Sequence, residues 1–190
     1  STLLASSAAS DVYKRQQFDF YDGGGLDLCY LGLAECDGHG NINVSRFGPR
    51  IAGCGGFINI TQNTHKVFFC GTFTAGGLKV KVEDGKVIIA QEGKQKKFLK
   101  DVEQITFNGD IALQNKQEVM YITERCVFQL KEDGMHLTEI APGIDLQTQI
   151  LDMMDFEPIV DRDANGEIKL MDAKLFAEGL MGLKEMKESC

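Results

Sequence analysis

The sequence predicts an α/β domain in which an open sheet with helices is accompanied by antiparallel hairpins. The run over 66–73 is too apolar for a strand with one face in water, so it predicts a central strand buried on both faces. Apolar residues alternate with lysines over 78–90 around an Asp-Gly turn, which indicates a hairpin. A glycine-rich run over 50–56 is followed by a short helical pattern that ends before Thr64.

The remaining elements follow in chain order. An apolar run over 26–34, a turn over 37–40 and alternation over 41–45 predict a strand, a tight turn and a second strand. A second hairpin is predicted with strands over 119–130 and 135–140. Helical spacing predicts a helix that begins near Asp145 and reaches 154, and a weaker pattern predicts a last helix over 170–183. Four lysines are interpreted as a solvated strand edge: Lys94, Lys96, Lys97 and Lys100.

The chain has 190 residues, enough for one domain, and its net charge is −8. An acidic surface disfavours nucleic acid and anionic membranes as partners. We predict no membrane span, because no apolar run approaches about 18 residues. The six cysteines have irregular spacings without a Cys-x-x-Cys pair, which favours reduced thiols and a cytoplasmic protein. Cys36 and His39 have a ligand-like spacing, but no second pair completes a zinc site, so no metal is predicted.

The first residues differ in character from the rest of the chain. Residues 1–10 lack the basic start of a signal peptide. Residues 11–16 look like a translated sequencing adapter. We therefore interpret residues 1–16 as an adapter-derived, non-native tail and residues 17–190 as the domain.

A glycine cluster formed by Gly53, Gly55 and Gly56 is the sharpest local feature. Such a loop can direct several backbone N–H groups at one phosphate or one developing oxyanion. It departs from the dinucleotide fingerprint because Ile58 replaces the third glycine, and no Gly-Lys-Ser/Thr follows to make a P-loop. The alternative is that these glycines only permit close packing of helix on strand, and the pattern alone leaves both interpretations open.

An acidic segment over 161–172 offers an alternative function, that of a non-enzymatic β-rich binding module with a calcium loop. Oxygen-bearing side chains fall at positions 1, 3, 5 and 12 of the segment, with glycine at position 6. Asp172 at position 12 is shorter than the usual glutamate, and Pro158 disrupts the entering helix. An acidic turn before the last helix is the simpler interpretation.

An ordered series of motifs covers nearly all of the domain. It includes Phe-Asp-Phe-Tyr-Asp-Gly-Gly-Gly over 18–25, Phe-Gly-Pro-Arg-Ile-Ala-Gly-Cys-Gly-Gly-Phe over 47–57 and Thr-Glu-Ile-Ala-Pro-Gly-Ile-Asp over 138–145. Shorter matches lie at 31–33, 39–43 and 73–77. Through this series the segment from 17 to about 183 resembles the C-terminal part of family I coenzyme A transferases of the acetate/propionate type.

The resemblance implies a partial CoA-transferase-type open sheet and a ping-pong transfer of CoA between a short-chain acyl-CoA and a carboxylic acid. In this family a glutamate of a Glu-x-Gly motif attacks the thioester, and that motif lies upstream of the segment seen here. Glu83 and Glu132 begin Glu-x-Gly triplets, but both fall in predicted hairpin turns. The chain is therefore expected to be an inactive fragment of an enzyme of short-chain fatty acid metabolism.

Site residues also follow from the resemblance. Gly53, Gly55 and Gly56 match the family glycine motif whose amides would stabilise the oxyanion, and Glu35 is a possible contact in the cleft. Coenzyme A is then a substrate, and no cofactor is expected. The parent enzyme is expected to be a homo-oligomer. Loss of its first half should expose apolar surface and cause self-association.

Overall fold

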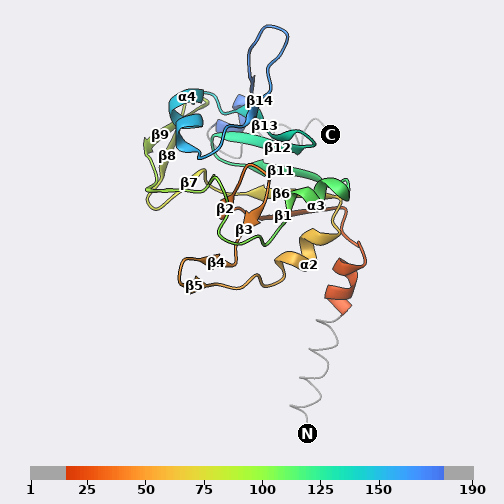
Figure 1. The fold of residues 1–190 in the computed structure, drawn as a ribbon. Coiled ribbons are helices and arrows are strands. Elements are labelled where there is room, and N and C mark those ends of the chain that lie inside the picture. Colours follow the sequence, from red (N-terminus) through yellow and green to blue (C-terminus); the bar gives the residue numbers. More distant parts are fainter. Residues whose placement is uncertain (1–15, 178–190) are drawn as a thin grey trace.

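The computed structural model describes residues 16–177, and its centre is a seven-stranded mixed sheet (Figure 1). The strands β1, β6 and β11 are parallel, and β11, β12 and β13 continue as an antiparallel meander. This architecture confirms the predicted α/β class with antiparallel hairpins. The sheet order is β1 (Leu28–Gly32), β6 (Lys66–Cys70), β11 (Glu118–Ile122), β12 (Cys126–Lys131), β13 (Gly134–Ile140) and β14 (Ile159–Val160), with β15 (Lys169–Leu170) also paired to β13.

Smaller elements surround the sheet. Antiparallel two-stranded pairs are β2 (Glu35–Cys36) with β3 (Ile42–Asn43), β4 (Arg46–Phe47) with β5 (Arg50–Ile51), β7 (Thr74–Ala75) with β10 (Gln95–Lys96), and β8 (Lys79–Glu83) with β9 (Lys86–Gln91). The helices are an α-helix over 16–22, α2 (Phe57–Gln62), α3 (Gly109–Gln114), α4 (Leu146–Gln149), and the 3-10 helices η1 (Leu151–Met153) and η2 (Ala173–Phe176). Within residues 16–177 no helix has the length and apolar character that crossing a bilayer requires.

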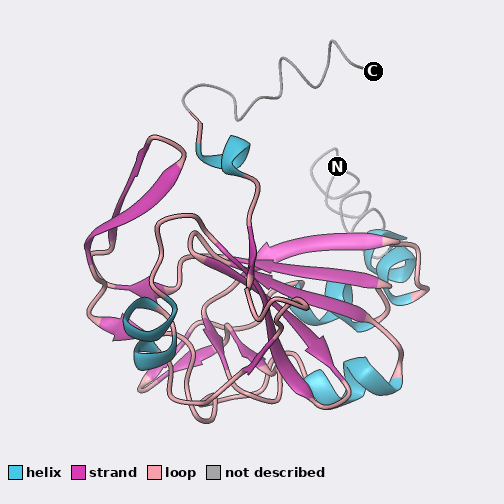
Figure 2. Ribbon diagram, turned by 90° about the horizontal axis from the view of Figure 1, so that it is seen from above, coloured by secondary structure: helices cyan, strands magenta, loops and turns pink. Residues whose placement is uncertain are grey.

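Helices α2 and α3 are the crossovers from β1 to β6 and from β6 to β11, and both lie on one side of the sheet (Figure 2). The core lies between them and the sheet, where Val67, Phe69, Val119 and Tyr121 are fully buried. Phe57 at the start of α2 stacks on Phe69 with ring centroids 5.7 Å apart. Burial of these large apolar side chains holds the crossovers against the sheet.

The opposite face of the parallel strands is open to solvent. Phe68 on β6 is only half-buried, and Tyr30 on β1, which stacks on it at 4.9 Å, is 66% exposed. The prediction of a central strand is confirmed because β6 pairs with β1 and β11. The prediction that this strand is buried on both faces is wrong, since among residues 16–177 only the α2 side of β6 is fully covered.

Three elements differ from the sequence prediction. The predicted strand over 119–130 is divided by a turn at 123–125, where Thr123 Oγ1 donates to the Cys126 carbonyl and accepts from the Cys126 N–H. The predicted helix after Asp145 is confirmed at its start, because the Asp145 carboxylate accepts from the Thr148 N–H at 2.8 Å, but it soon becomes 3-10. Over 170–177 the chain forms β15 and η2 instead of a long helix, and 178–183 lie outside the described residues.

The strands predicted over 26–34 and 41–45 do not pair with each other. The run over 26–34 contributes β1 to the main sheet, and the tight turn over 37–40 connects β2 to β3. Asp37 organises this turn, because its Oδ1 accepts the N–H groups of His39 and Asn41. Local pattern therefore located the turn, whereas the parallel partner of β1 lies 38 positions along the chain at Lys66.

Candidate functional site

The carboxyl ends of the parallel strands meet at one edge of the sheet, which we call the carboxyl edge. Strands β1, β6 and β11 end at Gly32, Cys70 and Ile122 in the same register row. Helix α2 ends just before β6 begins, so its first residue points toward the carboxyl edge and brings the glycine cluster with it. Ligand-binding residues of open α/β sheets gather at this edge, so it is the candidate site.

The glycine cluster has a backbone that favours glycine. Gly53 and Gly55 have φ values of +80° and +53°, the left-handed region that other L-residues rarely adopt. A Cβ at either position would meet nothing within 4 Å, so close packing does not explain these two glycines. The packing interpretation is therefore wrong for them, and the requirement comes from backbone conformation.

The amides of the cluster are not equivalent. The Gly53 N–H donates to the Ser45 carbonyl at 3.1 Å and is therefore occupied. Within residues 16–177, the N–H groups of Gly55 and Gly56 donate to no protein acceptor. Of the three predicted oxyanion donors, two are free in this structure, and their role stays a prediction.

Glu35 lies on β2 at the same edge. Its Oε2 accepts from Asn43 Nδ2 at 2.7 Å, and Asn43 is fully buried, so the carboxylate is oriented by a fixed amide. Glu35 also lines a cavity of about 330 Å³ with Phe47, Ala75 and Lys97. This position permits the predicted cleft contact.

Lys97 is a residue of this edge that the sequence analysis missed. It is only 8% exposed, and its Nζ donates to the Thr72 carbonyl at 2.7 Å. Burial lowers the pKa of Lys97, and the nearby Glu124 carboxylate opposes that effect. The interpretation of the lysine cluster as a solvated edge is therefore wrong for Lys97, because the side chain turns inward beneath the strand ends.

Arg125 lies in the turn after β11, and the sequence analysis did not identify it as a residue of this edge either. Its side chain is fully buried, and its guanidinium donates to both oxygens of Glu92 at 2.8 and 3.0 Å and to Glu124 at 2.7 Å. It also donates to the Gln149 carbonyl and lies 4.8 Å from the centre of the Phe73 ring. Arg125 thus joins the residue that follows β9 (Glu92) and the last residue of α4 (Gln149) to the turn after β11 through charge-assisted bonds.

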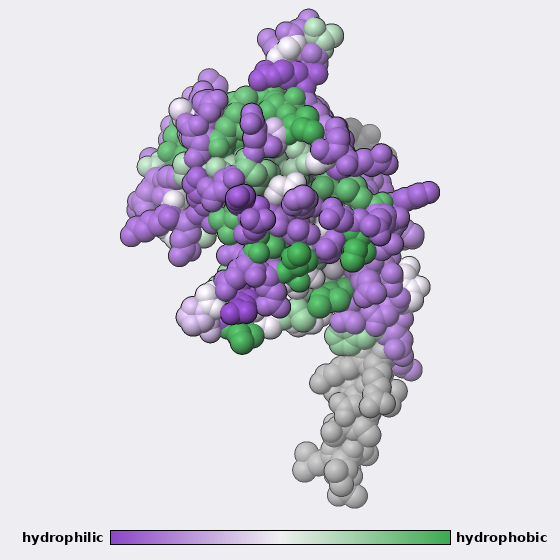
Figure 3. Space-filling view, in the orientation of Figure 1, coloured by the Kyte–Doolittle hydropathy of each residue, from purple (hydrophilic) through white to green (hydrophobic). Residues whose placement is uncertain are grey.

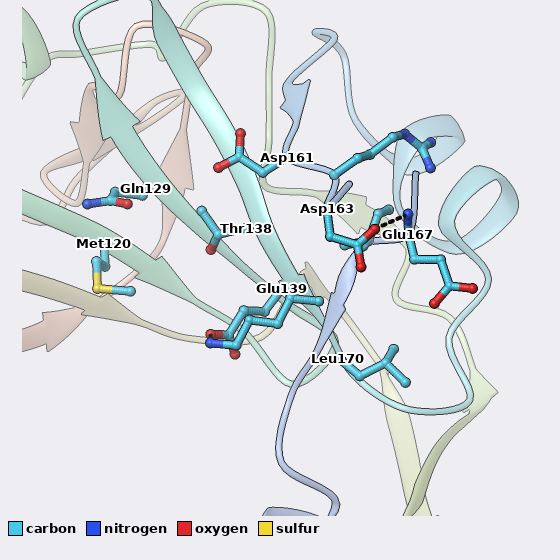
Figure 4. Close-up of a pocket in the computed structure, with 11 residues that line it drawn as sticks. Met120, Gln129, Thr138, Glu139, Asp161, Asp163, Glu167 and Leu170 are labelled. Carbon is cyan, nitrogen blue, oxygen red and sulfur yellow. Dashed lines mark hydrogen bonds and ion pairs between the residues drawn. The ribbon is translucent and has the colours of Figure 1, made fainter. Parts of the chain in front are cut away.

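The acidic segment over 161–172 borders a different cavity, of about 720 Å³, which lies over strands β11, β12 and β13 (Figure 4). Asp163 Oδ1 accepts the N–H groups of Asn165 and Glu167, so this carboxylate closes its own turn. Asp161 bonds to Lys131 and His136, and Asp172 accepts from the Lys174 N–H. The carboxylates do not converge, and residues 16–177 contain no metal-binding group of three His, Cys, Asp or Glu side chains. This geometry gives the calcium-loop alternative no support.

The two Glu-x-Gly triplets lie where the sequence placed them, in hairpin turns. Glu83 ends β8 and pairs with Lys86, while Glu132 lies in the turn between β12 and β13. Neither triplet follows a strand of the parallel part of the sheet. Neither therefore belongs to the carboxyl edge.

Comparison with known proteins identifies the class. No family model matches the chain. It is 57% identical over 166 residues to acetate CoA-transferase YdiF of Escherichia coli strain K12, which covers 87% of this chain and 30% of that protein. It is 52% identical over 182 residues to caffeate CoA-transferase of Acetobacterium woodii, which covers 93% of this chain and 34% of that protein.

Solved structures show the same similarity to CoA-transferases. The crystal structure of the acyl-CoA transferase YdiF apoenzyme from Escherichia coli O157:H7 gives a TM-score of 0.83 at 56% identity, covering 88% of this chain and 32% of that one. Another structure of the same protein is a thioester complex with CoA, with the same TM-score. The decarboxylase AibA/AibB, at 15% identity and a TM-score of 0.60, shares the fold.

By sequence and by fold, this chain is thus related to CoA-transferases. The family resemblance drawn from the motifs is confirmed, and so is the predicted fold class. The chain spans about a third of the length of the curated relatives that it matches.

Proposed function

We propose that this chain forms one wall of the active site of a CoA-transferase for short-chain acids and lacks the attacking carboxylate. The observation that carries the proposal is 57% identity to an acetate CoA-transferase over 87% of the chain. The thioester complex with CoA of a relative supports acyl-CoA as one substrate. The names of the relatives include both acetate and caffeate, so the preference for a short acyl chain rests on the motif resemblance.

The proposed reaction begins when a glutamate carboxylate attacks the thioester carbon of the acyl-CoA. The carbon–sulfur bond breaks, the CoA thiolate leaves, and a mixed anhydride forms. The thiolate then attacks the glutamyl carbonyl, which releases the first acid and forms a glutamyl-CoA thioester. The acceptor acid repeats these steps in reverse, so atoms and charge balance without a redox step or a cofactor.

The residues of this chain would act on the oxyanion of each tetrahedral intermediate. The free amides of Gly55 and Gly56 can donate to it, and one such donor contributes about 3 kcal/mol in a closed site. Gly53 would hold the loop through its bond to Ser45. Glu35, oriented by Asn43, would contact the substrate in the cleft.

The surface beside the glycine cluster supports a covered site. Ile51 and Ile58 flank the cluster and are 81% and 43% exposed. Hydrophobic side chains reach the surface around the β4–β5 hairpin and α2 (Figure 3). Exposed apolar residues of this kind mark an interface, here with the part of the enzyme that carries the nucleophile.

A direct assay tests the proposal. The 190-residue chain alone should give no turnover of acetyl-CoA with propionate, because within residues 16–177 neither Glu-x-Gly glutamate lies at the carboxyl edge. Turnover by the purified chain would refute that statement. We further propose an intracellular, homo-oligomeric parent, in accord with the free thiols of the five described cysteines.

A matched pair of variants tests the amides in an enzyme completed by the preceding part of the Escherichia coli relative. Gly56 has φ −84°, a value that proline can adopt, so Gly56→Pro removes the N–H at this position. It should lower kcat about 100-fold. Gly56→Ala keeps the N–H, and its Cβ would meet the Phe18 ring at 3.4 Å, an ordinary contact. Equal activity of the two variants would exclude the Gly56 amide as a donor.

A further inference from the structure

Lys97 is a buried lysine at the carboxyl edge that the proposed reaction does not use. It follows β10 directly, and the Cys36 N–H donates to its carbonyl at 2.8 Å, so its backbone runs beside β2. A Cβ at Gly71, the residue after β6, would lie 3.1 Å from Lys97 Nζ. The amino group therefore lies against the carboxyl end of β6, where a glycine leaves room for it.

The amino group of Lys97 has few partners. Within residues 16–177 its Nζ forms one hydrogen bond, to the Thr72 carbonyl at 2.7 Å, although a lysine has three N–H donors. Burial lowers the pKa of Lys97 and outweighs the nearby Glu124 carboxylate, which raises it. A lysine with a lowered pKa is neutral more often at neutral pH, and the neutral amine is the nucleophilic form.

The cavity that Lys97 lines gives a short acyl group access to this amine. It has a volume of about 330 Å³, and its walls include the apolar side chains of Leu33, Phe47 and Ala75. Cavities of this size hold whole small molecules, so an acetyl or propionyl group fits easily. The Glu35 carboxylate lines the same cavity and can accept the proton that the amine loses.

We propose that Lys97 Nζ is a modification site, acylated directly by the acyl-CoA that the enzyme uses. The inference rests on the proposed function for the identity of the acyl donor. The neutral amine attacks the thioester carbon, an amide bond forms, and the carbon–sulfur bond breaks. The CoA thiolate leaves and takes up the proton lost by the nitrogen, directly or through Glu35. One amine and one thioester thus give one amide and one thiol, without a redox step.

Acylation would change the carboxyl edge in two ways. It removes the positive charge near Glu124, and it places an acyl group in the cavity beside Glu35. The amide N–H that remains can still donate to the Thr72 carbonyl. Acylation therefore obstructs the predicted cleft contact of Glu35 while the strand ends stay in place, and it links the state of the cavity to the supply of acyl-CoA.

The test treats the full 190-residue chain with acetyl-CoA at neutral pH and measures acetylation of each lysine by mass spectrometry. Cleavage after glutamate releases residues 93–103 as one peptide, in which the exposed Lys94 and Lys100 are internal controls for Lys97. Lowering the pKa of an amine by one raises its neutral fraction about tenfold at neutral pH, so Lys97 should exceed each control at least about threefold. The excess should shrink as the pH approaches the ordinary lysine value of 10.5, where exposed amines also become neutral.

Two controls isolate the effect of the folded environment. In guanidinium the chain is unfolded, so Lys94, Lys97 and Lys100 should react equally. Glu124→Gln removes the carboxylate that favours the ammonium form, so it should speed acetylation of Lys97 and leave Lys94 unchanged. Glu139→Gln is the matched variant, because the Glu139 carboxylate pairs with Lys169, and it should not change the rate at Lys97.

The outcomes separate this inference from the proposed function. Acetylation of Lys97 that does not exceed that of Lys94 and Lys100 overturns the modification site, whether or not a completed enzyme transfers CoA. An excess that persists in guanidinium, or a rate at Lys97 that Glu124→Gln leaves unchanged, overturns it as well. An excess at Lys97 that is confined to the folded chain, with no CoA transfer by the completed enzyme, supports the modification site and refutes the proposed function.

Discussion

Arg125 offers the sharpest stability test, because its buried charge faces two carboxylates. Arg125→Met keeps much of the apolar volume but removes the donors to Glu92, Glu124 and the Gln149 carbonyl. Removing one partner of a buried ion pair costs about 3–5 kcal/mol. The carboxylates of Glu92 and Glu124 are 30% and 17% exposed and keep some water, so we expect about 3 kcal/mol.

Guanidinium denaturation of the full chain measures this loss. Arg46→Met is the matched control, because Arg46 is 53% exposed and its contact with Glu103 is 3.3 Å long, so the loss should stay below about 1 kcal/mol. The double variant Arg125→Met/Glu92→Gln should recover part of the stability, since it removes one unpaired charge. A loss below about 1 kcal/mol for Arg125→Met alone would refute the assignment of Arg125 as the electrostatic centre of this edge.

Three further predictions concern single positions. A Cβ at Gly40, where φ is +75°, would lie 2.7 Å from Tyr121 Oη, so Gly40→Ala should cost about 3 kcal/mol in denaturation, against about 1 kcal/mol for Gly48→Ala in open space. His136→Gln cannot reproduce both bonds of the imidazole to its two aspartates, and should speed proteolysis of the loop over 161–168. Burial opposes the ionised form of Glu92, but bonds from its arginine and threonine partners outweigh this and lower its pKa. The contribution of ionised Glu92 to the free energy of unfolding is complete above its ordinary pKa of 4.5 and is lost as the pH falls through its lower pKa in the folded state. Glu92→Gln should therefore reduce the loss of stability at acid pH when the free energy of unfolding is measured against pH.

Local pattern was sufficient for several elements. The glycine-rich run and the apolar residues after it predicted a loop and the helix α2, and the Asp-Gly turn predicted the β8–β9 hairpin. These features depend on φ preferences and side-chain periodicity within a few residues. The order of the motifs also identified the family, because it samples the whole segment.

Local sequence patterns predicted only part of the candidate site. The sequence located the glycine cluster and Glu35, but it could not show that the Gly53 N–H donates a hydrogen bond to the Ser45 carbonyl. It also placed Lys97 in solvent, because a lysine-rich run has no local signal that distinguishes an inward from an outward ammonium. Thr72, the partner of Lys97, lies 25 positions away.

The amino-acid sequence by itself determined the local backbone of this protein, its hairpin turns and its relation to CoA-transferases. Only the tertiary structure decided which charges are buried, where the strand over 119–130 is interrupted and which strands of the described residues pair with one another. Local conformation follows from the torsional preferences of neighbouring residues, whereas burial depends on distant segments. Arg125 meets Glu92 across 33 positions, and that contact exists only after the chain has folded.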